Sequence, residues 1–246
     1  MNSMAGSYDP FLVSLSFIIS VIGSFAALRL AKVIPLQEPE DRLPWVLAAA
    51  FALGAGAIWS MHFIGMLAFD MGMPVTYDVP ITALSMVLAW AVAAVGFYIV
   101  SRGSTSPARI ALSGVLMGCG VAIMHYTGMS AMRMAATMTF DTALVVLSVL
   151  IAVVASSVAL WLAFNIKKTW QMAAASVVMG IAVTGMHYTG MVAARFEMND
   201  SQSTVLVSSV SSEFLAYTVF LLSLVIMALG IAFGRVNEGY EDLVLE

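Results

Sequence analysis

The chain has 246 residues, of which 61% are hydrophobic and only 10% are charged, and its formal net charge is −4 at pH 7. Because ordinary soluble domains carry roughly 25% charged residues, this composition excludes a soluble globular protein and indicates a polytopic membrane protein whose main partner is the lipid bilayer. The weakly negative charge provides no basic surface for a nucleic-acid partner.

Seven apolar runs approach or exceed the roughly 20 residues needed to cross a bilayer. These runs are too long and too continuously apolar to be the alternating strands of a membrane barrel, so we expect helices. The sequence therefore predicts an all-α integral membrane protein with seven transmembrane helices, at 11–33, 43–69, 80–101, 109–134, 143–166, 170–194 and 213–235.

The lysines and arginines predict the orientation of these spans. If the N-terminus is outside, eight of the ten basic residues lie at inner loops and helix ends, and only Arg133 and Arg195 lie outside. An excess of Lys and Arg marks the cytoplasmic side of a membrane protein. We therefore expect the N-terminus outside and the C-terminus in the cytoplasm.

All three histidines of the chain, His62, His125 and His187, lie in the same pattern, Met-His-x-x-Gly-Met, inside the second, fourth and sixth predicted spans. The spacings of 63 and 62 residues indicate a repeated two-helix unit, so we expect three such repeats followed by a seventh helix. Each histidine precedes the outer end of its span by roughly seven to nine residues, which places the three at one depth.

Small residues accompany each motif at equivalent positions, namely Ala55, Gly118 and Gly180. Small side chains allow helices in lipid to approach closely. A three-fold arrangement of the repeats can therefore bring the three imidazoles together near an axis.

Each motif also places a methionine four residues after its histidine, on the same face of a helix. Thioether sulfur suits Cu(I), and imidazole binds copper, zinc and iron, whereas carboxylates would favour magnesium, calcium or manganese. Copper is therefore the expected metal, and the expected ligands are three histidines and three methionines: His62, His125, His187, Met66, Met129 and Met191.

Further methionines and two aspartates lie outward of the motifs, where they can lead a soft cation in from the exterior: Met71, Met73, Met132, Met134, Met138, Met198, Asp70 and Asp78. The single cysteine, Cys119, lies off the face of His125, and we expect it to be a buried structural thiol. Trp59 is expected to be an ordinary packing aromatic.

Three alternatives remain open for the histidines. They can be structural hydrogen-bonding groups, two of them can ligate heme, or they can belong to a metal or proton transporter. An enzyme is not expected, because no span contains a carboxylate pair or a nucleophile with its base.

The motifs Met-His-Tyr-Thr-Gly-Met at 124–129 and 186–191, with the variant Met-His-Phe-Ile-Gly-Met at 61–66, closely resemble the bacterial MHYT integral membrane sensor domain. The similarity covers essentially the whole chain. It implies a sensor of a diatomic gas such as oxygen, carbon monoxide or nitric oxide, with protein-bound copper at the histidines and methionines named above. Phe63 and Ile64 depart from the pattern, so a ligand role for Tyr or Thr is not implied.

The resemblance also implies a multi-pass protein of the bacterial inner membrane that signals to a fused or partner cytoplasmic domain of cyclic-di-GMP metabolism. We expect residues 1–236 to form the sensor domain and 237–246 to form a cytoplasmic tail, as a truncated linker to that signalling domain. A homodimer is one assembly that we leave open.

Overall fold

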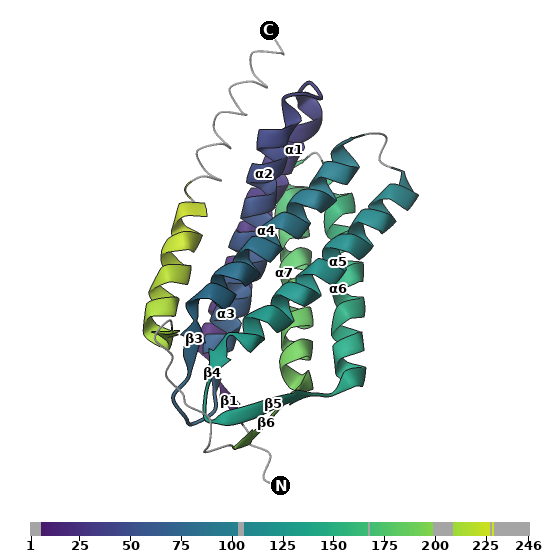
Figure 1. Ribbon diagram of the computed structural model, residues 1–246. Coiled ribbons are helices and arrows are strands. Elements are labelled where there is room, and N and C mark those ends of the chain that lie inside the picture. The colour runs from purple at the N-terminus through teal and green to yellow at the C-terminus, as the bar shows by residue number, and fades with distance from the viewer. Residues whose placement is uncertain (1–5, 103–105, 167, 199–208, 227, 229–246) are drawn as a thin grey trace.

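The structure is a computed structural model that describes residues 6–102, 106–166, 168–198, 209–226 and 228. Six helical stretches are long and apolar enough to cross a membrane and run side by side in one bundle (Figure 1). They are Pro10–Leu36, Arg42–Leu67, Val79–Ser101, Pro107–Ser130, Thr142–Asn165 and Thr169–Ala193. A mostly helical, multi-pass fold is therefore confirmed. Of the seventh predicted span, 213–235, the structure describes the helix Ser212–Ile226, and the rest of that span, apart from residue 228, lies outside the described residues.

The first two stretches contain more than one kind of helix. α1 (Pro10–Val33) continues into the 3-10 turn η1 (Ile34–Leu36). The second stretch is a single rod in which α2 (Arg42–Phe51) and α3 (Ser60–Leu67) are joined by a π-helix, η2 (Ala52–Trp59). The other four stretches are regular: α4 (Val79–Ser101), α5 (Pro107–Ser130), α6 (Thr142–Asn165) and α7 (Thr169–Ala193).

Three small antiparallel sheets, which the sequence did not predict, connect the helices at the predicted outer end of this mostly helical fold. β1 (Ser7–Tyr8) pairs with β2 (Phe69–Asp70), β3 (Thr76–Asp78) pairs with β4 (Met132–Arg133) and with β7 (Ser209–Ser211), and β5 (Ala136–Phe140) pairs with β6 (Ala194–Met198). The spans predicted to reach 69, 134 and 194 end instead at Leu67, Ser130 and Ala193, because the chain there turns into a strand.

Three of these pairs, β1 with β2, β3 with β4 and β5 with β6, each close one two-helix repeat, because the strand before the first helix pairs with the strand after the returning helix. We call these repeats unit 1 (7–70), unit 2 (76–133) and unit 3 (136–198). In each unit an aspartate caps the first helix with its side chain: Asp9, Asp78 and Asp141. The backbone N–H of the same aspartate donates to a carbonyl at the end of the returning helix, at 2.8 to 2.9 Å. The period in the sequence thus corresponds to a repeated structure at one end of the bundle, the strand pair with its capping aspartate, which we call the clamp of each unit.

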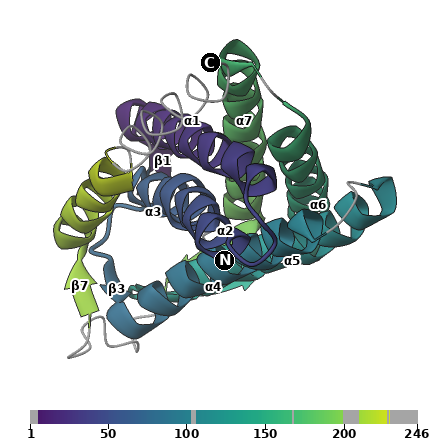
Figure 2. The same ribbon diagram turned by 90° about the horizontal axis from the view of Figure 1, so that it is seen from above.

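The three units form a closed ring. The returning helix of each unit packs against the first helix of the next, and α7 of unit 3 packs against α1 of unit 1 (Figure 2). Glycines make these contacts close: a Cβ at Gly118 would lie 2.4 Å from the backbone of α6, and one at Gly180 would lie 2.6 Å from a side chain of α1.

In unit 1 the glycine in this role is Gly54, where a Cβ would lie 2.5 Å from a backbone oxygen of α4. The sequence spacing named Ala55 instead. The difference arises because a π-helix accommodates an extra residue relative to an α-helix, which shifts the register of everything before it by one position. Ala55 is itself fully buried, but the position equivalent to Gly118 and Gly180 is Gly54.

The rod Arg42–Leu67 is the most buried of the six stretches, whereas Thr142–Asn165 is largely exposed and carries apolar side chains there, as expected of a helix that faces lipid. The helix Ser212–Ile226, yellow in Figure 1, lies beside unit 1. Ile226 contacts η2 closely, since a Cβ at Gly56 would lie 2.8 Å from its Cγ2. The C-terminal helix therefore packs on the rod that carries His62.

Candidate metal centre

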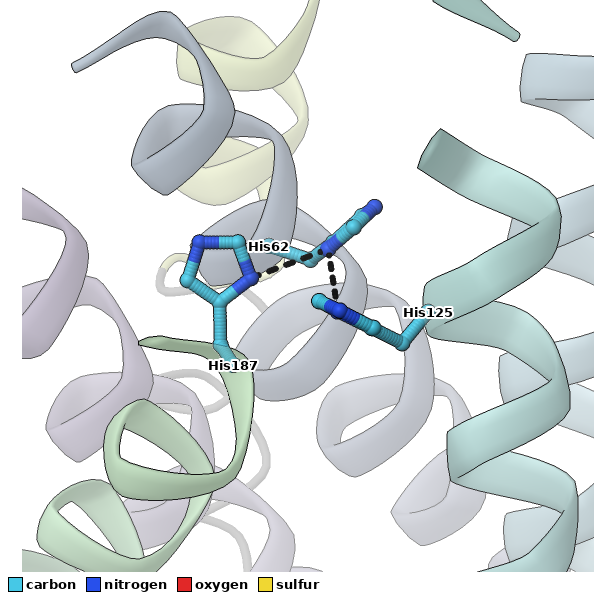
Figure 3. A group of neighbouring side chains, drawn as sticks. All are labelled: His62, His125 and His187. Atoms are coloured by element: carbon cyan, nitrogen blue, oxygen red, sulfur yellow. Dashed lines mark hydrogen bonds between the residues drawn. The ribbon is translucent and has the colours of Figure 1, made fainter. Parts of the chain in front are cut away.

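The three histidines meet in the interior of the bundle, one from each unit. His62 lies on α3, His125 on α5 and His187 on α7, and each is at most 1% exposed. The Nδ1 of His62 lies 3.1 Å from the Nδ1 of His187 and 3.1 Å from the Nδ1 of His125 (Figure 3). Histidines separated by more than 60 residues in the sequence therefore form one cluster.

The common depth expected for the histidines is also present. α3 and α5 end five residues after their histidines and α7 ends six residues after its own. At 1.5 Å per residue the imidazoles lie about 7.5 to 9 Å from the helix ends. They are nearer to that end than the sequence indicated, because the strands begin earlier than the predicted loops.

The glycine of each motif makes room for an imidazole from another unit. A Cβ added at this glycine would lie 2.3 to 2.4 Å from the Nε2 of that ring, which is closer than any real contact. The pairs run once around the ring of units: His62 with Gly128, His125 with Gly190 and His187 with Gly65. The histidine and the glycine of the motif are therefore two halves of one inter-unit contact.

Hydrogen bonding within the cluster is incomplete. None of the three Nε2 atoms has a hydrogen-bond partner among the described residues, although all three are buried. The Nδ1 of His62 has two imidazole neighbours, and a neutral ring nitrogen can donate one proton or accept with one lone pair. Buried polar atoms usually have a hydrogen-bond partner. Unpartnered nitrogens in a buried cluster are therefore candidates for ligands of a bound ion.

The separations fit a shared metal ion. With metal–nitrogen bonds of about 2.0 to 2.1 Å, three nitrogens around one ion lie about 3.3 to 3.6 Å apart, slightly more than the observed 3.1 Å. Of all His, Cys, Asp and Glu side chains in the described part of the chain, the group that can hold a metal consists of these three histidines. All three ligand nitrogens lie within 4.8 Å of one another, so a small adjustment of the rings would bring each pair to the spacing of a shared ion.

The predicted methionine ligands, Met66, Met129 and Met191, are all buried, one helical turn beyond the histidines. Their position is compatible with ligation, and their role as ligands stays a prediction.

A second set of contacts, which the sequence analysis missed, holds the histidine-bearing helices in place. The residue after the histidine bonds a serine on the next unit in two cases: Tyr126 Oη lies 2.7 Å from Ser148 Oγ, and Tyr188 Oη lies 3.4 Å from Ser16 Oγ. Each ring therefore sits beside a polar link between units.

Unit 1 makes the equivalent link with a different residue. Phe63 replaces the tyrosine and has no hydroxyl, but Trp59, one turn earlier, donates its Nε1–H to Ser85 Oγ at 3.0 Å. Trp59 is therefore more than a packing aromatic. The sequence does contain a pattern that marks these serines. Each capping aspartate is followed by five residues and then by Leu-Ser, whose serines are Ser16, Ser85 and Ser148.

Two other side chains near the site differ from expectation or add to it. Cys119 is exposed on α5, so the expectation of a buried thiol is wrong. At the predicted outer end, Tyr8 packs edge-on against Tyr188 at 5.4 Å. Burial, together with the neighbouring phenol of Tyr188, raises the pKa of Tyr8 to about 12.

Comparison with known proteins agrees with this architecture. The family model MHYT, described as a bacterial signalling protein N-terminal repeat, matches residues 56–113 and 118–176. The two matches contain the motifs of His62 and His125. The third motif lies outside them but occupies the equivalent place in unit 3.

Three curated relatives illustrate where such chains occur. The chain is 39% identical over 93% of its length to the bifunctional diguanylate cyclase/cyclic di-GMP phosphodiesterase MucR of Pseudomonas aeruginosa, covering 34% of that protein. It is 34% identical over 92% of its length to the cyclic di-GMP phosphodiesterase NbdA of the same organism, covering 29% of it. It is 34% identical over 77% of its length to the signalling protein YkoW of Bacillus subtilis, covering 24% of it.

The chain thus spans about a quarter to a third of the length of these relatives. No solved structure matches it. Three equivalent units, a histidine from each at one centre and two matches to the repeat identify the chain as a member of the MHYT family, as the sequence predicted.

Proposed function

We propose that this chain is a membrane sensory module that holds a copper ion among His62, His125 and His187. The observation that carries the proposal is the convergence of three buried Nδ1 atoms, two pairs of which are 3.1 Å apart. An imidazole buried in a bilayer is costly and usually functional. Three of them in contact are more than helix packing requires.

The donor set supports copper over other metals. Imidazole nitrogens with thioethers one turn away suit a soft ion, and Met66, Met129 and Met191 are the proposed additional ligands. When bound, copper supplies a coordination position at which a diatomic gas such as oxygen, carbon monoxide or nitric oxide is sensed. The residues of the chain hold the ion and exclude water, and they transmit a change at the ion to the rest of the bundle.

Heme ligation fits the arrangement less well than a bare ion. The centroids of the imidazole rings are 4.8 to 5.2 Å apart, which leaves no space between any two of them for a macrocycle with both faces ligated.

A route for the signal begins at the π-helix. His62 lies three residues after η2, and η2 contacts Ile226 of the C-terminal helix at Gly56. π-Helical turns are frequent at functional sites. A ligand shifts a conformational equilibrium only by binding two states differently, and movement of His62 would reach the C-terminal helix through this contact.

The relatives support a proposal for the output of the sensor. Two of them are named as enzymes of cyclic-di-GMP metabolism, and the chain corresponds to 34% of one and 29% of the other. We propose that the chain is a non-enzymatic sensor of the bacterial inner membrane, N-terminus outside, that signals to such a cytoplasmic domain.

The test is the metal content of the purified full chain. We expect the wild-type chain to retain copper by elemental analysis after chelator washing, and the double variant His125→Ala/His187→Ala to lose it. Met117→Leu, a buried methionine two turns before His125 on α5, is the matched control and should retain copper. Full retention in the double variant, or a Soret band in the wild-type chain, would overturn the proposal.

A further inference from the structure

A pocket of about 510 Å³ opens at the predicted outer end, between units 1 and 2. Its walls come from β1 and the start of α1, from the end of α3 with β2 and the loop that follows, from β3 and β4, and from Ser212. Four of its 15 lining residues are methionines, Met66, Met71, Met73 and Met132, whereas the chain has 19 methionines in 246 residues. About one would be expected by composition, so thioethers are concentrated here.

The loop that carries two of these methionines has a fixed conformation. Gly72, between Met71 and Met73, has a positive φ of 69°, a conformation that glycine adopts readily. Its backbone N–H donates to Asp70 Oδ1 at 2.7 Å. The turn therefore holds the two methionines in place at the pocket instead of leaving them on a free loop.

Carboxylates at the pocket give it a negative charge. Asp9 and Asp70 both line it and are exposed, and their described hydrogen bonds engage only Oδ1. Units 2 and 3 have an arginine where unit 1 has Asp70, so this end of unit 1 attracts cations and the same places in the other units do not.

One residue, Met66, belongs both to the pocket lining and to a histidine motif. Met66 lines the pocket, is 1% exposed, and lies one helical turn after His62.

We propose that this pocket is a second, outer binding site for Cu(I), built by Met71, Met73 and Met132, from which the ion passes by way of Met66 to the three histidines. The passage is an exchange of thioether for imidazole ligands with no change in oxidation state. The transfer of the ion to the histidines rests on the proposed function. Binding of the ion in the pocket does not.

Silver(I) is a suitable probe of binding, because it is soft, prefers thioethers and is not redox-active. In the full chain carrying His125→Ala/His187→Ala, we expect one Ag(I) to remain bound. Adding Met71→Leu/Met73→Leu should weaken that binding roughly tenfold or more. Leucine approximates the volume of methionine, and circular dichroism in detergent checks that the helices are retained.

The transfer step is tested by the rate at which limiting Cu(I) loads the otherwise wild-type chain. Met71→Leu/Met73→Leu should slow loading but leave the final copper content unchanged. The matched control is Met134→Leu/Met138→Leu, which changes two other methionines of the outer end that do not line the pocket, and it should load at the wild-type rate.

Unchanged Ag(I) binding in the chain with all four substitutions would overturn the outer site. An unchanged loading rate in Met71→Leu/Met73→Leu would overturn the transfer. If the wild-type chain binds one Ag(I) that depends on Met71 and Met73 but not on the histidines, the outer site stands and the histidine centre of the proposed function falls.

Discussion

Unit 1 and units 2 and 3 solve the same structural problem with different residues. All three bring a histidine to the centre and a glycine beneath a neighbouring imidazole. Units 2 and 3 reach it on regular α-helices, and unit 1 reaches it through the π-helix η2. The histidine and the glycine, which all three units share, therefore define the centre. The π-helix is a feature of unit 1 that units 2 and 3 do not share.

The differences in unit 1 lie at three places: its link to unit 2, its outer strand and its contact with the helix Ser212–Ile226. Its inter-unit link uses Trp59 instead of a tyrosine, its clamp has Asp70 instead of an arginine, and its η2 segment contacts the C-terminal helix at Gly56. Unit 1 thus combines carboxylates at the predicted outer end with a contact to the helix Ser212–Ile226, which is the combination that the proposed ion entry and signal route require.

The largest expected effect comes from breaking the tryptophan link of unit 1. Trp59→Ala, which gives unit 1 the residue that unit 2 has at this position, should destabilise the chain by about 3 to 5 kcal/mol through lost packing. Adding Phe63→Tyr completes the pair found in unit 2 and should recover about 1 kcal/mol by restoring a bond to Ser85. The free energy of unfolding, measured by SDS titration, reports both.

Two further variants test whether the tryptophan and tyrosine links are equivalent. Phe63→Tyr with Trp59 intact should destabilise, because Ser85 is already bonded and a buried hydroxyl is left without a partner. Trp161→Ala, which removes an exposed tryptophan from α6, should have little effect. A Phe63→Tyr change that is equally costly in both backgrounds would show that the two links are not equivalent.

The second prediction addresses what the units share. Gly65→Ala, Gly128→Ala and Gly190→Ala each place a Cβ within 2.4 Å of an imidazole Nε2, so each should cost about 1 to 3 kcal/mol by overpacking and should lower the copper content. Because the contact is the same in all units, the three variants should behave alike, and a unit-specific loss would argue against a symmetric centre.

Gly185→Ala is the matched control, on α7 two residues before His187. Among the residues that the structure describes, none lies within 4 Å of a Cβ at this position, so the substitution should leave copper binding unchanged and stabilise the helix by up to about 1 kcal/mol. Retention of copper by the motif variants at the level of this control would contradict the proposed role of the motif glycine.

The sequence predicted the features that repeat along the chain. Hydropathy located the six described membrane-length helices, and the period of the motif located three histidines that do meet. Features that depend on which unit follows which in space were not predicted. The partner of Tyr126 is a serine on α6, and nothing in the motif itself names it.

The misplaced Ala55 shows a second kind of limit. A single extra residue in η2 is invisible to a count of spacing because the helix remains continuous and apolar, but it changes which residue faces α4. The outer sheets were missed for a related reason: strands of two to five residues are too short to give an alternating pattern.

The smallest expected effect concerns the ion pairs that unit 1 lacks. Arg133 and Arg195 each bond the capping aspartate of their own unit, at 3.1 and 2.7 Å. The shorter pair is the more exposed, with side chains 66% and 30% accessible against 28% and 10% for Arg133 and Asp78. Since exposure and not distance controls solvent screening, Arg133→Gln should cost about 0.5 to 1 kcal/mol and Arg195→Gln close to nothing. SDS titration at low and high salt would check this order. A larger loss of unfolding free energy for Arg195→Gln would mean that the distance between the paired atoms controls the strength of the ion pair. Unit 1, which has aspartate at this position, would then have the least stable strand pair of the three units.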